Sequence, residues 1–331
     1  MTALTARRAL EVIAVLVAVM PAAAVAQTPQ AAPPPPITMK QLKPDVWAGL
    51  GGAGGNSTII IGKTSVIVVD AKTSEAGAKD LLAEIAKITP KPVKTVILTH
   101  SDGDHVNGLA AFPTGIRIIA HENNKKEQQA ALAAGGRGAP PADRLPTETV
   151  TKTRESLTID GVKIELYHWA PAHTSGDLVV YLPDQKIAAT GDIIVTNRAD
   201  DNPNIHQEKN GSTAGWITSV KGIAGLNADT FVSGHGDLVT KADIERKLAA
   251  TTARREKIAQ MVKAGKSVDE IKAALPDAPA PGAPARAPAP PAGAQAAQAG
   301  RGPAAAGAPA GGRGAAPVTF VDIAYAELTK K

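Results

Sequence analysis

The chain has 331 residues, 44% of them hydrophobic but only 3% aromatic, and its formal net charge is +5 at pH 7. A charged fraction of 20% excludes a disordered polyelectrolyte, and the lack of cysteine excludes disulfides, thiolate metal ligands and thiol nucleophiles. The basic residues are scattered and form no run with aromatic residues, so no nucleic-acid partner is expected.

The N-terminus predicts an export signal. Arg7 and Arg8 precede a short apolar run, and a small-residue cleavage site, Ala-Val-Ala, ends at Ala26. We therefore expect a signal peptide over residues 1–26, a disordered Ala/Pro-rich lead-in over residues 27–36, and a location in a bacterial periplasm. The apolar run is short for a membrane span and no second long one follows, so no integral span is expected in the mature chain. An uncleaved anchor helix is the alternative.

The next region, residues 37–277, is expected to fold as one domain, because short apolar runs alternate with helical patterns throughout. Apolar β-branched runs are typical of buried strands, and apolar residues spaced three and four apart are typical of helices. This mixture favours two sheets covered by helices, a layered α/β or α+β sandwich. We expect strands at 59–62, 65–70, 93–99, 116–121 and 229–236, hairpins at 156–170 and 177–192, and helices at 76–88, 109–112, 123–134, 214–226 and 241–265.

The C-terminal part differs in composition. Residues 278–316 are nearly all Ala, Pro and Gly with no acidic residue, so they cannot bury a core and are predicted to be a disordered tether. Residues 317–331 restore an amphipathic pattern through Phe320, Ile323 and Leu328. We expect a short helix that docks on the domain, with a frayed tail as the alternative.

Histidine and aspartate gather where apolar strands give way to turns that contain glycine or serine. The first turn holds four of them in HSDGDH, and others follow in PAHTSGD, AATGD and SGHGD. Loops at one sheet edge present such side chains together, and imidazole and carboxylate are ligands for zinc and non-haem iron. Seven such groups would suffice for two metal ions: His100, Asp102, Asp104, His105, His173, Asp192 and His235.

The order THSDGDH, PAHTSGD, TGD and SGHGD resembles the metallo-β-lactamase superfamily, and the resemblance covers residues 37–264, including GGNST and VIVVDA. It implies a four-layer αββα sandwich, a metal-dependent hydrolase and two divalent ions at one edge of the sheets, with zinc expected and iron or manganese as alternatives. It also implies that His100, the residue at 102 and His173 hold the first ion, that Asp104, His105 and His235 hold the second, and that Asp192 bridges them.

One position departs from the usual family motif, His-x-His-x-Asp-His: Asp102 stands where the second His is expected. Asp can be an oxygen ligand, but it is shorter than His and adds a negative charge. That charge should hold the metal more tightly and make it a weaker Lewis acid. We expect Asp102 to be a ligand of a dinuclear site; the alternative is that it empties the first site and leaves one metal.

Asp104 is the expected catalytic residue, because it can orient a hydroxide generated by the metals or accept its proton. Asp70, at the end of VIVVD, is expected either to orient a metal ligand or only to end its strand. His206 lies in a polar segment that often lines the substrate cleft in this family, so it is a candidate substrate contact, with an exposed loop His as the alternative. His121 and His168 fit no ligand turn and are expected to be structural.

These features predict an exported hydrolase of a small-molecule substrate, an ester or a lactone, with a β-lactam less favoured. Lack of cysteine excludes the lactamase subclasses with Cys at the position of Asp192, and Asp there is typical of relatives that cleave esters, lactones, thioesters or phosphodiesters. The alternative is a metal- or ligand-binding protein on a degenerate hydrolase scaffold, which Asp102 favours and the six retained ligand positions oppose. A structural envelope protein is a third hypothesis, and the sequence predicts no oligomeric state.

Overall fold

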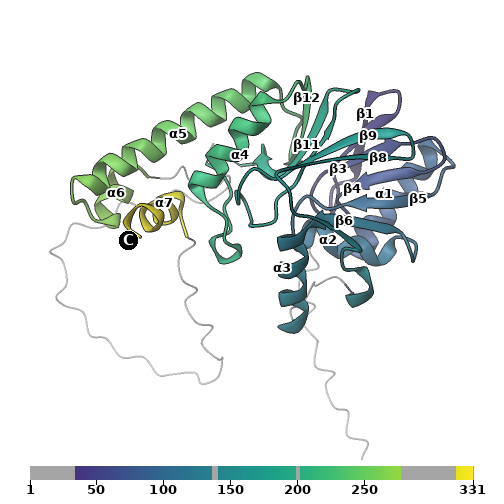
Figure 1. Ribbon diagram of the computed structural model, residues 1–331, viewed down its shortest axis with the longest axis horizontal. Coiled ribbons are helices and arrows are strands. Elements are labelled where there is room, and N and C mark those ends of the chain that lie inside the picture. The colour runs from purple at the N-terminus through teal and green to yellow at the C-terminus, as the bar shows by residue number, and fades with distance from the viewer. Residues whose placement is uncertain (1–33, 136–140, 199–201, 277–317, 331) are drawn as a thin grey trace, which may run out of the picture. The chain divides into compact units, whose positions relative to one another are not determined.

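Two β-sheets and the helices around them make up the part of the chain that the structure describes (Figure 1). The signal peptide predicted over residues 1–26, residues 27–33 of the lead-in and the tether predicted over residues 278–316 lie outside it. The computed structural model describes residues 34–135, 141–198, 202–276 and 318–330.

The first sheet has seven strands in chain order. The first four pair antiparallel, and the strands from β4 to β7 pair in parallel. Parallel neighbours need crossover connections, and their carboxyl ends lie at one edge of the sheet. The strands are β1 (Ile37–Lys43), β2 (Val46–Gly51), β3 (Ser57–Ile61), β4 (Val66–Val69), β5 (Val93–Ile97), β6 (Arg117–His121) and β7 (Glu148–Val150).

The second sheet has five strands in the order β12-β11-β10-β9-β8. The two predicted hairpins form its antiparallel part, and β12 joins β11 in parallel. The end of β12 therefore lies beside the end of β11, as the register between Val195 and His235 shows. The strands are β8 (Arg154–Ile159), β9 (Val162–Tyr167), β10 (Val179–Leu182), β11 (Ile187–Val195) and β12 (Thr230–His235).

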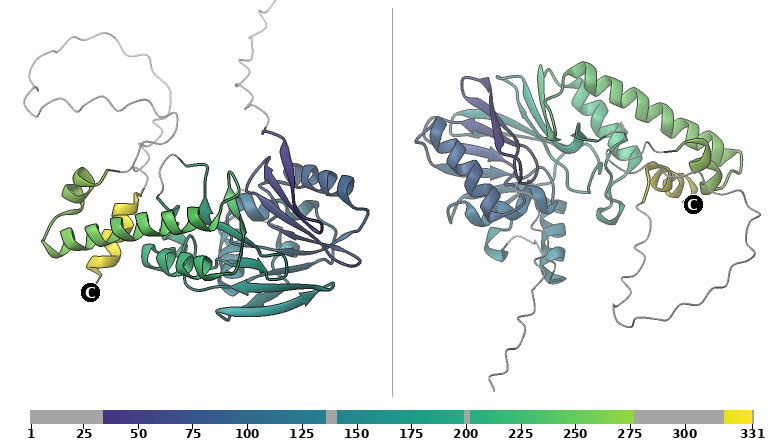
Figure 2. Two further views of the ribbon diagram at one scale, coloured as in Figure 1. Left: turned by 90° about the horizontal axis from the view of Figure 1, so that it is seen from above. Right: turned by 180° about the vertical axis from the view of Figure 1, so that it is seen from behind.

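Three apolar clusters separate four layers, which gives the αββα sandwich that the family resemblance implied. One cluster lies between the sheets and joins residues such as Ile67 of the first to Val180 of the second. A second packs α1 against the first sheet, and a third packs Trp216 of α4 and Ile244 of α5 against the second (Figure 2). The helices are α1 (Glu75–Ile88), α2 (Gly103–Val106), α3 (Glu122–Ala133), α4 (Thr213–Gly225), α5 (Lys241–Lys263), α6 (Val268–Ala274) and α7 (Phe320–Thr329), with short 3₁₀ turns η1 (Asn107–Ala111), η2 (Ala142–Arg144) and η3 (Gln207–Lys209).

The C-terminal helix α7 packs on the domain. Phe320, Val321 and Ala324 are buried in a fourth apolar cluster with Ile258 of α5 and Ile271 of α6. Thr319 begins the helix with a capping box, in which its side chain accepts from a backbone N–H and its own backbone N–H donates to Asp322. The cluster therefore joins three C-terminal helices into one packed unit.

The structure contains elements that the sequence patterns did not predict. The edge strands β1 and β7 and the helix α6 were not expected, and the ligand-rich turn after β5 folds into one turn of helix, α2. Ser267 and Glu270 form a capping box at the start of α6, a signal visible in the sequence. Among the described residues, no helix is both long enough and apolar enough to cross a membrane.

Replacing Phe320 by Ala should lower the free energy of unfolding by about 3 kcal/mol, because it leaves a cavity in a closed apolar cluster. Val318 is 62% exposed, so Val318→Ala serves as the matched control and should change the free energy of unfolding by less than ~0.5 kcal/mol. Urea unfolding followed by circular dichroism measures both. Equal effects of the two substitutions would contradict the docking of α7.

Candidate metal centre

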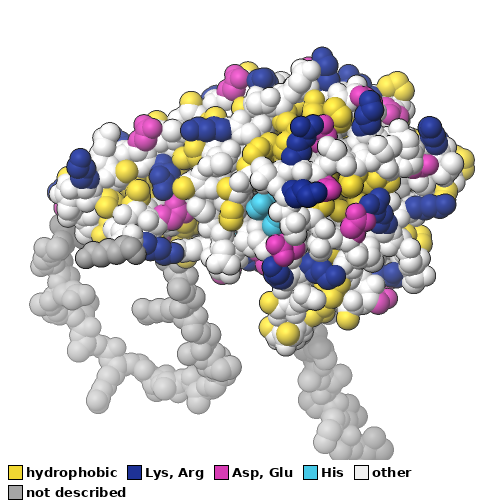
Figure 3. All heavy atoms as spheres, in the orientation of Figure 1, with side chains coloured by type: hydrophobic (Ala, Val, Ile, Leu, Met, Phe, Trp, Pro, Cys, Tyr) yellow, Lys and Arg dark blue, Asp and Glu magenta, His cyan; other side chains and the backbone are white. Residues whose placement is uncertain are grey.

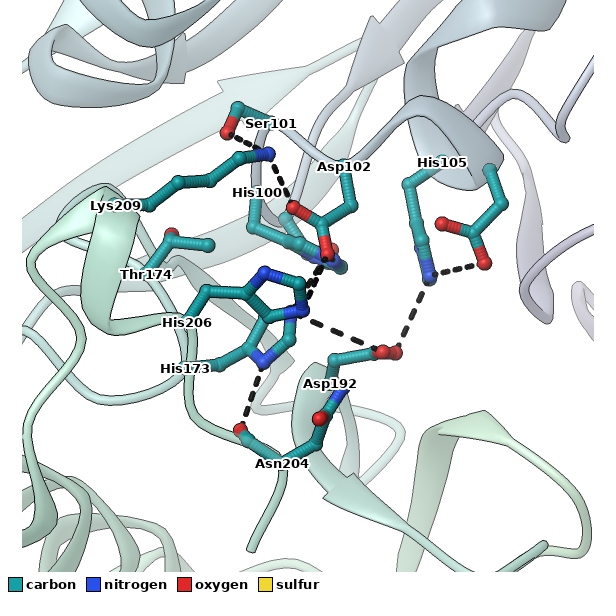
Figure 4. Close-up of polar contacts among 12 residues, drawn as sticks. His100, Ser101, Asp102, His105, His173, Thr174, Asp192, Asn204, His206 and Lys209 are labelled. Atoms are coloured by element: carbon teal, nitrogen blue, oxygen red, sulfur yellow. Dashed lines mark hydrogen bonds and ion pairs between the residues drawn. The ribbon is translucent and has the colours of Figure 1, made fainter. Parts of the chain in front are cut away.

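The seven predicted ligand residues meet at the edge where strands from both sheets end. His100 and Asp102 follow β5, and α2 then presents Asp104 and His105. Three further residues complete the cluster from the second sheet: His173 from the loop between β9 and β10 and Asp192 from β11, which Figure 4 shows, and His235 from the end of β12. The strand ends gather these side chains as expected, because parallel pairing aligns neighbouring ends within each sheet and the packing of the two sheets brings both edges together.

One group of ligand atoms combines both sheets. His105 Nε2 lies 3.3 Å from His235 Nε2 and 3.2 Å from Asp192 Oδ1, and His235 Nε2 lies 2.9 Å from Asp104 Oδ2. Ligand atoms of Asp104, His105 and His235 all lie within 4.8 Å of one another. Three nitrogen and oxygen donors at this spacing fit a single metal ion.

A second group lies beside it. Ligand atoms of His100, His173 and Asp192 also lie within 4.8 Å of one another. Asp102 Oδ2 is 3.0 Å from His173 Nε2 and 3.8 Å from His100 Nε2, so the carboxylate that replaces the expected imidazole faces this group. Asp192 contacts both groups, through Oδ1 to His105 and through Oδ2 to His173.

Two buried atoms in the cluster have no hydrogen-bond partner among the described residues. They are His100 Nε2, on a side chain that is 1% exposed, and Asp192 Oδ1, on one that is 6% exposed. Buried polar atoms are normally satisfied, because an unpaired one costs about 1–3 kcal/mol. His100 Nε2 lies 3.8 Å from Asp102 Oδ2, and Asp192 Oδ1 lies 3.2 Å from His105 Nε2 and 3.6 Å from His235 Nε2. Each therefore has other ligand atoms beside it, so divalent cations fit the residues present.

Hydrogen bonds behind the cluster fix the orientation of the imidazoles. Asp70 accepts from the backbone N–H of Thr99 at 2.8 Å and from its hydroxyl at 2.7 Å, and its Oδ2 lies 2.8 Å from His105 Nδ1. The same hydroxyl oxygen lies 2.8 Å from His100 Nδ1. With the proton on Nδ1 of each ring, both Nε2 atoms present lone pairs to the cluster. Asp70 thus orients candidate metal ligands, which is one of the two roles expected for it from the sequence, and does more than end its strand.

Close approach explains two glycines in the motifs. A Cβ on Gly55, in the GGNST stretch, would lie 2.1 Å from His105 Cε1. A Cβ on Gly234, in SGHGD, would lie 1.9 Å from Asp192 Oδ1. Only glycine leaves room for these two side chains at their present positions.

Lys209 is a site residue that the sequence analysis missed. Its ammonium pairs with Asp102 Oδ1 and donates to Ser101 Oγ at 3.2 Å. Ser101 in turn donates to Glu127 Oε2 at 2.5 Å, and Ser175 donates to Glu127 Oε1 at 2.6 Å. Glu127 therefore links the loop of the first motif to the loop of His173. No sequence pattern signals a contact between residues 107 positions apart, such as Lys209 and Asp102.

His206 lies at the rim of the cluster, with a side chain that is 32% exposed and Nε2 3.4 Å from Asp102 Oδ2. Histidine side chains reach the molecular surface here, next to acidic and basic groups (Figure 3). His121 and His168 lie apart as a stacked pair, with ring centroids 3.9 Å apart.

Burial and charge act in opposite directions on the ligand groups. Burial alone lowers the pKa of His173, but its hydrogen bond with Asp102 and the charge of Asp192 outweigh burial and raise the pKa to about 9. Burial likewise opposes the charged form of His105, yet Asp192 and Asp70 raise its pKa well above the usual value. Despite burial, the surrounding imidazoles hold the pKa of Asp192 far below its ordinary range.

Comparison with known proteins shows the family. A family model described as the metallo-β-lactamase superfamily matches residues 50–235, more than half of the chain. The chain belongs to the metallo-β-lactamase superfamily. The relatives named as lactamases and sulfatases are hydrolases, so membership of this family makes the chain a metal-dependent hydrolase. The fold and the candidate His/Asp clusters agree with the binding of divalent metal.

The chain is similar to proteins whose names describe different activities. The α subunit of a 2,4-dinitroanisole O-demethylase from Nocardioides sp. is 27% identical over 72% of this chain and 69% of its own. A linear primary-alkylsulfatase from Pseudomonas sp. is 26% identical over 53% of this chain and 40% of its own, and a type 2 metallo-β-lactamase from Bacillus cereus is 25% identical over 61% of this chain and 77% of its own.

Solved structures share the fold. A stereoselective inverting sec-alkylsulfatase from Pseudomonas sp. has a TM-score of 0.62 at 18% identity, over 73% of this chain and 46% of its own. The DIM-1 metallo-β-lactamase has a TM-score of 0.54 at 18% identity, over 66% of this chain and 99% of its own. The chain thus spans less than half of each of the two alkylsulfatases and nearly all of the lactamase.

Metal binding by the metal-free protein should release a proton at pH 7, because His173, with its pKa raised to about 9, holds a proton there and can ligate only when neutral. The apparent affinity should therefore rise with pH up to about 9. Titration calorimetry in buffers with different ionisation enthalpies measures the protons released. A binding enthalpy that does not depend on the buffer would contradict the raised pKa of His173.

Proposed function

We propose that the chain is a dinuclear hydrolase that cleaves a small carboxylic ester or lactone. The observation that carries the proposal is the pair of ligand groups on either side of Asp192, together with the buried His100 Nε2, which has no hydrogen-bond partner among the described residues. We assign the first metal to His100, Asp102 and His173, the second to Asp104, His105 and His235, and the bridge to Asp192.

Divalent ions in these places would supply a water molecule whose pKa is lowered from ~16 towards ~7, and a Lewis acid for the substrate oxygen. Asp104 is then the group that handles the proton. Its side chain is 36% exposed, so it can reach both the cluster and an incoming substrate, and its Oδ2 is held 2.9 Å from His235 Nε2. A carboxylate so placed can orient the attacking water and accept its proton.

The substrate assignment has two supports. The chain has no cysteine, and Asp192 is typical of family members that cleave esters, lactones, thioesters or phosphodiesters. Lys209 offsets the negative charge of Asp102 beside the first ligand group, which removes a repulsion against a substrate that becomes anionic on cleavage. The relatives' names add an aryl methyl ether, an alkyl sulfate and a β-lactam as alternative substrates.

The first measurement is the metal content per chain, by elemental analysis of protein prepared from a periplasmic fraction without chelators. Two ions per chain support the dinuclear assignment, and their identity separates zinc from iron or manganese. One ion or none would favour the metal- or ligand-binding protein instead. Loaded protein is then tested on esters, lactones, β-lactams, alkyl sulfates and aryl methyl ethers. Turnover only outside the first two groups would overturn the substrate assignment.

Replacing Asp104 by Asn should lower kcat by about 10²–10⁴-fold, because the amide keeps an oxygen ligand but cannot accept a proton. The metal content should stay at the wild-type value. Asp143, an exposed acidic residue of η2, supplies the control variant Asp143→Asn, which should leave kcat unchanged. An Asp104→Asn protein with full metal and unchanged kcat would show that Asp104 does not handle the proton.

A further inference from the structure

We propose that His206 is an additional ligand of the first metal, on the side where Asp102 stands. This inference rests on the dinuclear function proposed above and adds a residue to its first site. The segment that carries His206 is tied to an assigned ligand loop, since its backbone N–H donates to the carbonyl of His173 at 2.8 Å. Two backbone N–H groups, of Lys209 and Gly211, donate back to the His206 carbonyl at 3.0 and 2.9 Å.

The spacing of the ligand atoms fits a shared ion. His206 Nε2 lies 3.4 Å from Asp102 Oδ2, and that oxygen lies 3.0 Å from His173 Nε2. All three ligand atoms lie within 4.8 Å of one another. Two ligand atoms bound about 2.1 Å from one ion at tetrahedral or octahedral angles lie roughly 3.0–3.4 Å apart.

The orientation of the ring gives independent support. His206 Nδ1 pairs with the carboxylate of Glu208, while Nε2 points towards Asp102 (Figure 4). A hydrogen bond from Nδ1 to a carboxylate or carbonyl is the usual way in which a metal-binding histidine is fixed, because it leaves the lone pair on Nε2. His105 with Asp70, and His173 with the carbonyl of Asn204, are held in the same way.

Lys209 decides which oxygen of Asp102 faces the site. Its ammonium takes Oδ1, which leaves Oδ2 towards His173 and His206. Ser175 N–H donates to the Lys209 carbonyl at 2.8 Å, so the lysine backbone is fixed as well. The side chain of Asp102 is shorter than that of the histidine usual at this position of the motif. His206, from another loop, brings an imidazole to the same side of the first ligand group.

The test compares His206→Ala with Gln207→Ala, which changes an exposed neighbour in the same turn that has no part in the cluster. Both proteins, and the wild type, are titrated with Co²⁺ against a competing chelator, and their visible absorption spectra are recorded. His206→Ala should weaken one of the two Co²⁺ sites by about tenfold or more and change its spectrum. Free imidazole added to His206→Ala should restore part of the lost Co²⁺ affinity and part of the wild-type spectrum. Gln207→Ala should match the wild type in both measurements.

A compensating change sharpens the test. In the His206→Ala background, Asp102→His should recover the lost site, because it places an imidazole directly on the first motif. Unchanged Co²⁺ affinity and spectrum in His206→Ala would overturn the assignment, even with a raised KM, which would make His206 a substrate contact. A wild type that binds no Co²⁺ would overturn the dinuclear function itself and this ligand with it.

Discussion

The arrangement of the candidate metal centre depends on the hydrogen bonds that the carboxylate of Asp70 makes with Thr99 and His105. Asp70 directly follows β4, in a left-handed backbone conformation with φ of 64°, and is only 2% exposed. A buried charge is tolerated only when it is fully hydrogen-bonded, and the contacts to Thr99 and His105 meet that requirement. Through the Thr99 hydroxyl the same carboxylate also orients His100, so one residue orients an imidazole of each ligand group. Lys72, which is fully buried, donates to the carbonyls of the neighbouring glycine-rich turn and holds that turn against the centre.

Lys209 offsets the negative charge that Asp102 brings to the first ligand group. A carboxylate in place of an imidazole adds a negative charge, which by itself would reduce the Lewis acidity of the ion. The ammonium of Lys209 lies against that carboxylate and offsets the charge, so the pair is neutral as an imidazole is. Ser101 and Glu127 hold this arrangement from behind, so Asp102 is part of a larger hydrogen-bonded network.

The residues that the sequence could predict are those whose position follows from strand ends. His100 follows β5 and His235 ends β12, each after an apolar run. Parallel pairing sets the end of β5 beside that of β4 and the end of β12 beside that of β11, and the packing of the two sheets brings the two edges together. Lys209 and Glu127 could not be predicted in the same way, because they lie in a polar turn and on a helix and reach the site only through tertiary contacts. The helix α6 was missed although Ser267 begins it with a capping signal, because it is short and adjoins an Ala/Pro-rich segment.

The C-terminal helix bears on the metal centre as well as on stability. Glu327 of α7 accepts from the backbone N–H of Thr213 at 2.6 Å, at the start of α4, and pairs with Arg255 of α5 at 3.2 Å. A carboxylate at a helix N-terminus satisfies free N–H groups and favours the helix dipole. Two residues before Thr213, Gly211 packs so closely on His173 that a Cβ there would lie 2.2 Å from its carbonyl oxygen. The segment that carries His206 and Lys209 therefore ends in a helix start that α7 holds in place, so the packing of the last helix also limits how far these side chains can move from the cluster.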